Sequence, residues 1–239
     1  MVVSKVLGVS TSVVVVPGAP VLVPELSGAA AGESAAQVDA VVAMLRAAGA
    51  GVDSALVRGT DTAGRTIGDV SSSLVRWGAE VPVGRPGAPQ ADHEEVPDAA
   101  LIAWWLLDRA GIDLPRSFVG VTAAGRLPRL QSANTLVVVV ADGPASLSPR
   151  APVPEDPRGV ALDADLTGWL RNGGPLPDPG DVVAQAVGWW SRPAWLELSG
   201  LVGHRAAVES ISWAPFGVGY HSARWALSSS DSAAAGDQE

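Results

Sequence analysis

The side chain best placed for chemistry is Asp142, which follows the valine run that ends at Val140. Gly143 comes directly after it and leaves the backbone room to turn. A carboxylate in this position is either a turn residue that accepts nearby backbone N–H groups or an acid at the mouth of a ligand cleft. Both interpretations stay open on the sequence alone, and both direct attention to the end of this run.

Glu209 and the three histidines are the other groups suited to metal binding or proton transfer. Glu209 alternates with apolar neighbours, so it faces a cleft if its strand is internal and solvent if that strand is at an edge. In the last predicted strand, alternation places Tyr220 in the core and His221 at the rim or in a pocket. His93 lies in an acidic loop and is expected to be solvated, and His204 is expected to cap a helix end. No two histidines stand four residues apart, which excludes a helical zinc pair.

Several common catalytic patterns are missing from the chain. It has no phosphate-binding GxxxxGK[ST] loop, no GxGxxG after a predicted strand and no GxSxG nucleophile turn. It has no cysteine, which excludes disulfides, iron–sulfur clusters and zinc sites built from thiolates. The usual nucleotide-binding and serine-hydrolase sites are therefore not expected.

The composition is that of a globular protein with a large core. The chain has 239 residues, of which 47% are hydrophobic and 17% charged. The net charge of −9 and the scattered basic residues argue against binding to nucleic acid, whose phosphates require clustered lysine and arginine. No apolar run approaches the roughly 20 residues needed to span a bilayer. The first ten residues lack a secretory signal, so the expected location is the cytoplasm, with no membrane partner.

Continuous valine runs, rather than alternating ones, predict strands that are covered on both faces. Interleaved with helices, they predict a single three-layer α/β/α domain over residues 1–228 with a mostly parallel central sheet, followed by a disordered tail, 229–239. The predicted strands are 9–16, 54–58, 70–77, 117–122, 134–140, 206–213 and 219–227, and the predicted helices are 33–48, 98–112, 158–172, 179–190 and 193–202. In such folds ligands bind outside the carboxyl ends of the strands, so the ends after residues 16, 58 and 140 are the expected places for a site.

The predicted helix 98–112 is apolar on most of its sides. A helix of this kind is expected to be buried between a sheet and another layer. Asp98, at its first position, is expected to cap it.

Three stretches resemble a known family when they are taken together. They are VVPGAPVLVPELSGAAAGE near the start, TLVVVVADGPASLSPRAP in the middle and WAPFGVGYHSARW near the end. They resemble actinobacterial proteins that are similar to the catalytic subunit of the class III extradiol ring-cleavage dioxygenases, the superfamily that also contains the MEMO proteins. The resemblance runs in order from about residue 9 to residue 227, and APFGVGY is its most specific part. It implies an α/β core in which two histidines and one glutamate hold ferrous iron and a further histidine acts as acid and base.

The resemblance also implies where the metal ligands would stand in this chain. The first metal histidine of the family follows the first strand in a Ser-His-x-Pro turn, which matches residues 17–20 and places Gly18 at the ligand position. The second follows a short strand in an Asn-Asp-His-like turn, where Asp61 is the nearest match. The glutamate ligand corresponds to Glu209 in the loosest of these alignments. Both metal imidazoles are therefore missing, and the remaining carboxylates do not make a nitrogen-rich iron site.

The acid/base histidine of the family lies in a Gly-Gly-x-Ser-His motif after the central strand. This chain keeps the glycine and the serine as Gly143 and Ser146, but Leu147 stands in place of the histidine. Leucine cannot transfer a proton. The resemblance therefore predicts the fold of the dioxygenases without their ring-cleavage activity.

Two functional hypotheses follow for the strand ends. The leading one is a divergent dioxygenase-like protein that requires no cofactor and whose strand-end cleft binds a small molecule or a protein partner. The alternative is a metal-dependent enzyme of altered chemistry, in which Asp61, Asp142 and Glu209 hold a divalent ion such as Mg²⁺ or Mn²⁺. Asp61 and Glu209 are the candidate metal ligands in that case.

A third hypothesis concerns the nine tryptophans of the chain. Trp189, Trp190 and Trp195 would form the subunit interface of a homo-oligomer, because tryptophan is favoured at the centre of interfaces. The competing explanation is that these side chains fill the core.

Overall fold

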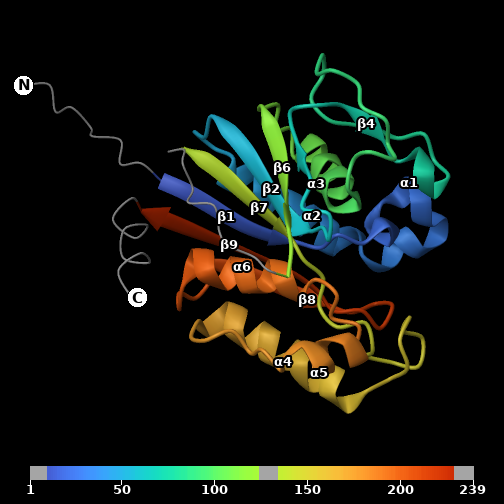
Figure 1. Ribbon diagram of the computed structural model, residues 1–239, viewed down its shortest axis with the longest axis vertical. Helices are drawn as coiled ribbons and strands as arrows, with labels where there is room; N and C mark the ends of the chain where they lie inside the picture. The colour runs from blue at the N-terminus through green and yellow to red at the C-terminus, as the bar shows by residue number, and fades with distance from the viewer. Residues whose placement is uncertain (1–9, 124–133, 229–239) are drawn as a thin grey trace, which may run out of the picture.

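The valine runs form the middle of a seven-stranded sheet with the strand order β3-β6-β2-β7-β1-β9-β8 (Figure 1). The computed structural model describes residues 10–123 and 134–228. The strands of this sheet are β1 (Ser10–Val16), β2 (Ser54–Thr60), β3 (Thr66–Ile67), β6 (Arg116–Val121), β7 (Thr135–Val140), β8 (Glu209–Trp213) and β9 (Tyr220–Ser228). Six of them correspond to predicted strands, with small shifts at their ends.

The strands in the middle of the sheet run parallel to one another. β1 pairs with β7, β7 with β2, and β2 with β6, all in parallel register. β3, β9 and β8 each pair antiparallel with their inner neighbour. The sheet is therefore mostly parallel, as predicted. The carboxyl ends of the parallel strands, at Val16, Thr60, Val121 and Val140, lie along one edge, where β9 begins.

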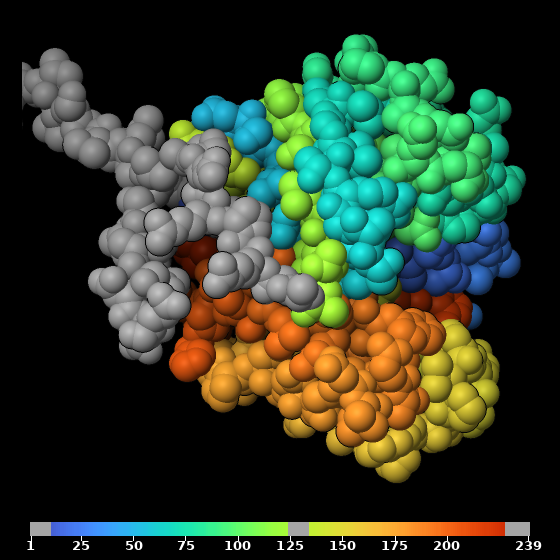
Figure 2. Space-filling model, in the orientation of Figure 1, coloured from blue at the N-terminus to red at the C-terminus, as the bar shows by residue number. Residues whose placement is uncertain are grey.

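Helices cover both faces of the sheet, which confirms the three-layer prediction (Figure 1). One layer holds α2 (Ala35–Ala48) and α3 (Asp98–Arg109), and the other holds α4 (Pro157–Asn172), α5 (Asp181–Ala186) and α6 (Arg192–Val202). The valines of β1 alternate between the two: Val14 and Val16 pack in the core of the first layer, and Val13 and Val15 in that of the second. In Figure 2 the segment from β2 to α3, cyan to green, forms one side of the molecule, and α4 to α6, yellow to orange, form the other. A strand buried in this way requires an apolar side chain at every position, which accounts for the continuous valine run.

Helix α3 is buried on nearly every side, as its sequence predicts. Eight of its residues are buried, and it contacts β2 on one side and the short strand β5 (Pro82–Val83) on another. Asp98 does not cap the helix as expected, because it is the first helical residue and Pro97 takes the capping position without a side-chain hydrogen bond. The Asp98 carboxylate instead accepts a hydrogen bond from Arg76 at 2.5 Å.

The prediction of a strand over residues 70–77 is wrong. Only β4 (Ser72–Ser73) is extended there, and it pairs with β5 outside the main sheet. The next residues, Val75–Trp77, form the 3₁₀ turn η3, which ends at Gly78 with a φ of 93°. Leu74 is fully buried in the core to which α3 also belongs, so the apolar character of this segment reflects burial in that core.

The remaining elements lie between β1 and α2. They are the 3₁₀ turn η1 (Pro20–Leu22), the short helix α1 (Pro24–Ser27) and the 3₁₀ turn η2 (Gly28–Glu33). The predicted tail 229–239 lies outside the described residues. Within the two described ranges, no helix combines the length and the apolar character that a membrane crossing requires.

Candidate functional site

The predicted site residues Gly18, Asp142, Gly143 and His221 come together at the carboxyl edge of the sheet. The backbone N–H of Gly18 donates a hydrogen bond to Oδ1 of Asp142 at 2.9 Å. A Cβ atom at Gly143 would lie 2.9 Å from Nε2 of His221. The ends of β1 and β7 and the start of β9 thus build one cluster, as expected for neighbouring strands that turn at the same edge.

Asp142 connects the ends of β1 and β7 and does not cap a local turn. Its hydrogen-bond donor, Gly18, lies 124 positions away in the chain. Its backbone carbonyl accepts the indole N–H of Trp195, on α6, at 2.9 Å. Burial raises the pKa of Asp142 to about 6, against the opposing effects of the Gly18 N–H and of His221. The side chain is therefore a partly buried acid that changes its charge just below neutral pH.

Gly18 occupies a position in which a side chain has no space. A Cβ atom there would lie 2.7 Å from Cγ1 of Val140, the last residue of β7. Val140 is almost fully buried and branched at Cβ, so it has little freedom to move aside. The place that the resemblance aligns with a metal-binding histidine is thus closed by the core itself.

Replacing Gly18 with alanine is expected to lower the free energy of unfolding by about 1–3 kcal/mol, the usual effect of overpacking a core. The physical reason is the overlap between the new methyl group and Val140. Urea denaturation of Gly18→Ala measures the loss. In a Val140→Ala background the same replacement should be nearly neutral, and an equal loss in both backgrounds would contradict the packing explanation.

His221 is fully buried, which rules out the rim alternative, and Tyr220 is in the core as predicted. Nε2 of His221 lies 3.0 Å from Oδ1 of Asp163 on α4, and Nδ1 lies 2.9 Å from Oγ of Ser212 on β8. The ring of Trp195 packs edge-on against the imidazole, with 5.5 Å between the ring centroids. Because a carboxylate only accepts, this network places the proton on Nε2 and lets Nδ1 accept the Ser212 hydroxyl.

Two glycines make room for this buried histidine and its carboxylate. A Cβ atom at Gly219 would overlap Oδ1 of Asp163, and one at Gly143 would lie 3.2 Å from the same oxygen. The N–H of Gly143 donates to the carbonyl of Gly219 at 2.7 Å, which holds the two turns together. The sequence drew attention to His221 but not to Asp163, because the partner of a buried histidine depends on which helix packs over it.

Ser146 and Leu147 lie in the turn after Asp142 and contribute packing. Ser146 is fully buried, and within the described ranges its hydroxyl has no hydrogen-bond partner. It packs so closely on Gly159 of α4 that any Cβ there would overlap it. Leu147 donates its backbone N–H to the carbonyl of Gly217 at 2.9 Å. Neither side chain is a group that transfers a proton at pH 7.

The two candidate metal ligands are each paired with an arginine. Asp61 is buried at the end of β2, where Arg65 contacts both of its oxygens, and this arginine lowers the pKa of Asp61. Glu209 begins the edge strand β8 and accepts a hydrogen bond from Arg224 at 2.6 Å, which favours the solvent-facing alternative. Throughout residues 10–123 and 134–228 no three histidine or acidic side chains are grouped closely enough to hold a metal ion. Asp61, Asp142 and Glu209 therefore do not form one site.

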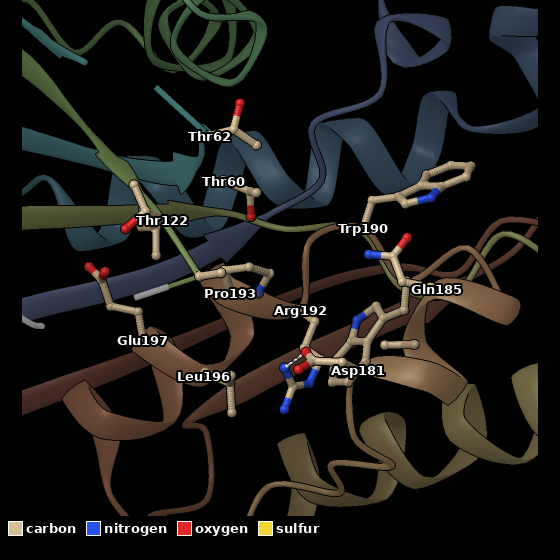
Figure 3. Close-up of a pocket in the computed structure, with 14 residues that line it drawn as sticks. Thr60, Thr62, Thr122, Asp181, Gln185, Trp190, Arg192, Pro193, Leu196 and Glu197 are labelled. Atoms are coloured by element: carbon tan, nitrogen blue, oxygen red, sulfur yellow. Dashed lines mark hydrogen bonds and ion pairs between the residues drawn. The ribbon is translucent and has the colours of Figure 1, made fainter. Parts of the chain in front are cut away.

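A cavity of about 520 Å³ opens at the carboxyl ends of β2 and β6 (Figure 3). Thr60 and Thr122 line it from the strand side, and Gln185 of α5 and Pro193 of α6 line it from the helix side. The end of β2 is one of the three strand ends at which a site was expected. We call this cavity the strand-end cleft. The cluster around Asp142 and His221 does not line it.

A buried ion pair forms part of the wall of the strand-end cleft. Arg58 of β2 is 3% exposed and Glu197 of α6 is 8% exposed, and Glu197 lines the cleft. The guanidinium contacts both carboxylate oxygens, through Nε to Oε1 and through Nη2 to Oε2 at 2.8 Å. An arginine in a buried strand is a sequence signal for such a partner, but the sequence does not show which of the 25 acidic residues supplies it.

The tryptophans that were considered for a subunit interface divide into two kinds. Trp189 and Trp195 are fully buried, which favours the core-packing explanation for both. Trp190 is 54% exposed and lines the strand-end cleft. The exposed indole of Trp190 is thus part of the wall of the strand-end cleft.

The sequence was compared with protein-family models and with characterised proteins. No family model matches the sequence, and no characterised protein matches it. The geometry of the strand ends is therefore the basis on which a function can be assigned to this chain.

Proposed function

We propose that this chain is a dioxygenase-like protein without ring-cleavage activity that binds a small organic molecule in the strand-end cleft. The observation that carries the proposal is the cleft itself. Its volume of about 520 Å³ falls within the roughly 300–1,000 Å³ of small-molecule sites. Its position at the carboxyl ends of β2 and β6 is where parallel α/β sheets usually bind ligands.

Ferrous iron does not fit the residues that the resemblance aligns with its ligands. Gly18 offers no side chain, and Val140 occupies the space into which one would grow. Asp61 is held by Arg65, and Glu209 stands on an edge strand. Iron that activates oxygen in such enzymes requires two imidazoles and a carboxylate on one face of the metal. This set of side chains provides neither imidazole.

The alternative of a carboxylate-held Mg²⁺ or Mn²⁺ receives no support from the geometry. Mg²⁺ needs several oxygen ligands around one point. Asp142 accepts from a backbone amide, and Asp61 and Glu209 are each neutralised by an arginine. We therefore keep small-molecule binding as the proposed function.

A ligand-observed NMR screen tests the binding part of the proposal. The library contains neutral, anionic and cationic fragments, and we expect some of them to bind the wild-type protein at millimolar concentrations or better. Their signals should weaken in Trp190→Ala, which removes an exposed side chain of the cleft without opening the core. Binding that is unchanged in this variant, or the absence of any bound fragment, would overturn the proposal.

Ring cleavage is the activity that the proposal excludes. Protein incubated with ferrous iron without oxygen, and then exposed to air with catechol or protocatechuate, should form no ring-opened product above the level of iron alone. Product that increases with protein concentration would show that the chain retains the activity.

A further inference from the structure

Each charged side chain that lines the strand-end cleft is already paired with a charge of the protein. Glu197 is held by Arg58. Arg192, at the start of α6, donates to Asp178 at 2.6 and 2.7 Å and also contacts Asp181. An anionic ligand would have to displace a carboxylate from Arg192, and a cationic ligand would have to compete with Arg58 for Glu197. Both exchanges lose charge-assisted hydrogen bonds, so the cleft favours an uncharged molecule.

The uncharged polar groups of the cleft offer both donors and acceptors. Thr60, Thr62 and Thr122 each contribute a hydroxyl, and Gln185 contributes an amide. Each oxygen of Glu197 accepts from Arg58, and a carboxylate oxygen has a second lone pair for a ligand hydroxyl. Hydroxyl groups, which donate and accept at once, match this mixture better than groups that only donate or only accept.

Two polar atoms in the cleft wall have no hydrogen-bond partner within the described ranges. They are Oγ1 of Thr60 and the indole Nε1 of Trp189, and both are shielded from water. Trp189 is fully buried, so its N–H cannot be satisfied by bulk solvent. A buried polar group without a partner is destabilising. Such groups are uncommon in folded proteins, and here they make part of the cleft wall polar.

An exposed aromatic surface completes the cleft. Trp190 is 54% exposed, and in Figure 3 it lies with Gln185 at one end of the cleft, opposite Glu197 and Thr122. The flat face of an indole packs well against the C–H face of a saturated ring, because the ring's C–H groups carry partial positive charge and the indole face is negative. Polar groups on one side and an indole on the other thus suit a ring that is apolar on its face and hydroxylated at its rim.

We propose that the strand-end cleft binds a neutral polyhydroxylated ring, that is, a monosaccharide or disaccharide. This inference rests on the proposed function, because it names the chemical class of the molecule bound at that site. In the complex, the sugar face packs on Trp190 and its hydroxyl groups bond to Glu197, Thr62 and Thr122. The ion pairs of the cleft disfavour charged ligands of the same shape.

Saturation-transfer difference NMR on the full chain tests this proposal with matched compounds. The neutral set is methyl β-D-glucopyranoside, methyl α-D-mannopyranoside, maltose and cellobiose. Glucose 6-phosphate and glucosamine add a negative or a positive charge to the same ring, and benzyl alcohol has an aromatic ring without the polyol. We expect at least one neutral sugar to bind. Both charged sugars should bind with at least about fivefold lower affinity, which corresponds to roughly 1 kcal/mol in the free energy of binding.

Two variants locate the bound sugar. Trp190→Ala should weaken binding about fivefold or more. Val182→Ala, which removes an exposed apolar side chain of α5 that does not line the cleft, should leave binding unchanged.

Three outcomes would overturn the proposal. They are tighter binding of a charged sugar than of its neutral counterpart, binding of benzyl alcohol with no binding of any neutral sugar, and neutral-sugar binding that Trp190→Ala does not change. In the first two cases the fragment screen still decides whether the cleft binds small molecules, so failure of the sugar class is distinguishable from failure of the proposed function.

Discussion

Replacing Glu197 with alanine is expected to lower the free energy of unfolding by about 3–5 kcal/mol, the usual effect of breaking a buried ion pair from one side. The replacement leaves the guanidinium of Arg58, which is only 3% exposed, charged and without its carboxylate in the layer between β2 and α6. Nη1 of Arg58 already lacks a partner within residues 10–123 and 134–228. Urea denaturation of the variant measures the loss.

A double variant separates the charge from the packing. Arg58→Met combined with Glu197→Leu removes both charges and keeps apolar volume, so it should recover most of the stability that Glu197→Ala loses. Arg58→Met alone should be milder than Glu197→Ala, because Glu197 lines the strand-end cleft and water can reach that wall. A loss of less than about 1 kcal/mol in Glu197→Ala would show that the pair behaves like a surface salt bridge.

Asp142 is expected to make the folded protein less stable as the pH rises from about 4 to about 7. Its pKa is about 6 in the folded protein, against an ordinary value of 3.8. Below the ordinary pKa the Asp142 carboxyl group is protonated in both the folded and the unfolded protein, so it causes no loss of stability there. Between the two values the unfolded chain releases its proton first, so stability falls with rising pH until the folded protein has ionised as well. The two pKa values imply a loss of up to about 3 kcal/mol at roughly 1.4 kcal/mol per pKa unit.

Asp142→Asn tests this pH dependence directly. The asparagine oxygen still accepts the N–H of Gly18 but never ionises, so the variant should match the wild type near pH 4 and exceed its stability by up to about 3 kcal/mol at pH 8. Val182→Ala, an exposed replacement on α5 that changes no ionisable group, is the control and should show a difference from wild type that does not change with pH. A constant difference for Asp142→Asn over the whole range would contradict the expected titration.

The sheet was predictable because its central strands are marked by continuous apolar runs in their own stretches of sequence. Each valine of β1 is buried on one face or the other, so the run of valines itself indicates a strand with helices on both sides. The segment 70–77 carried a similar apolar signal for a different reason, namely the burial of Leu74 in the core that contains α3. Apolar content predicts burial, and only its length and continuity distinguish a strand from a turn that packs on a helix.

The candidate site was predictable only in part. The positions of Asp142 and Gly143 followed from the end of a strand, because parallel strands of one sheet end at one edge. The partners of the site residues did not follow, since Asp163 lies 58 positions from His221 and Glu197 lies 139 positions from Arg58. Such pairs are decided by which helix packs on which strand, and no local pattern encodes that choice.

The position of β1 has a consequence for how the chain acquires its structure. β1 lies between β7 and β9, so Val13 pairs with Val137 on one side and with Trp225 on the other. β1 therefore has no strand partner in the sheet until residues more than a hundred positions later have been synthesised. Loop closures of this length slow folding, and an unpaired valine strand is prone to self-association meanwhile. On the ribosome, β1 therefore remains without either of its strand partners until β7 and β9 have been synthesised.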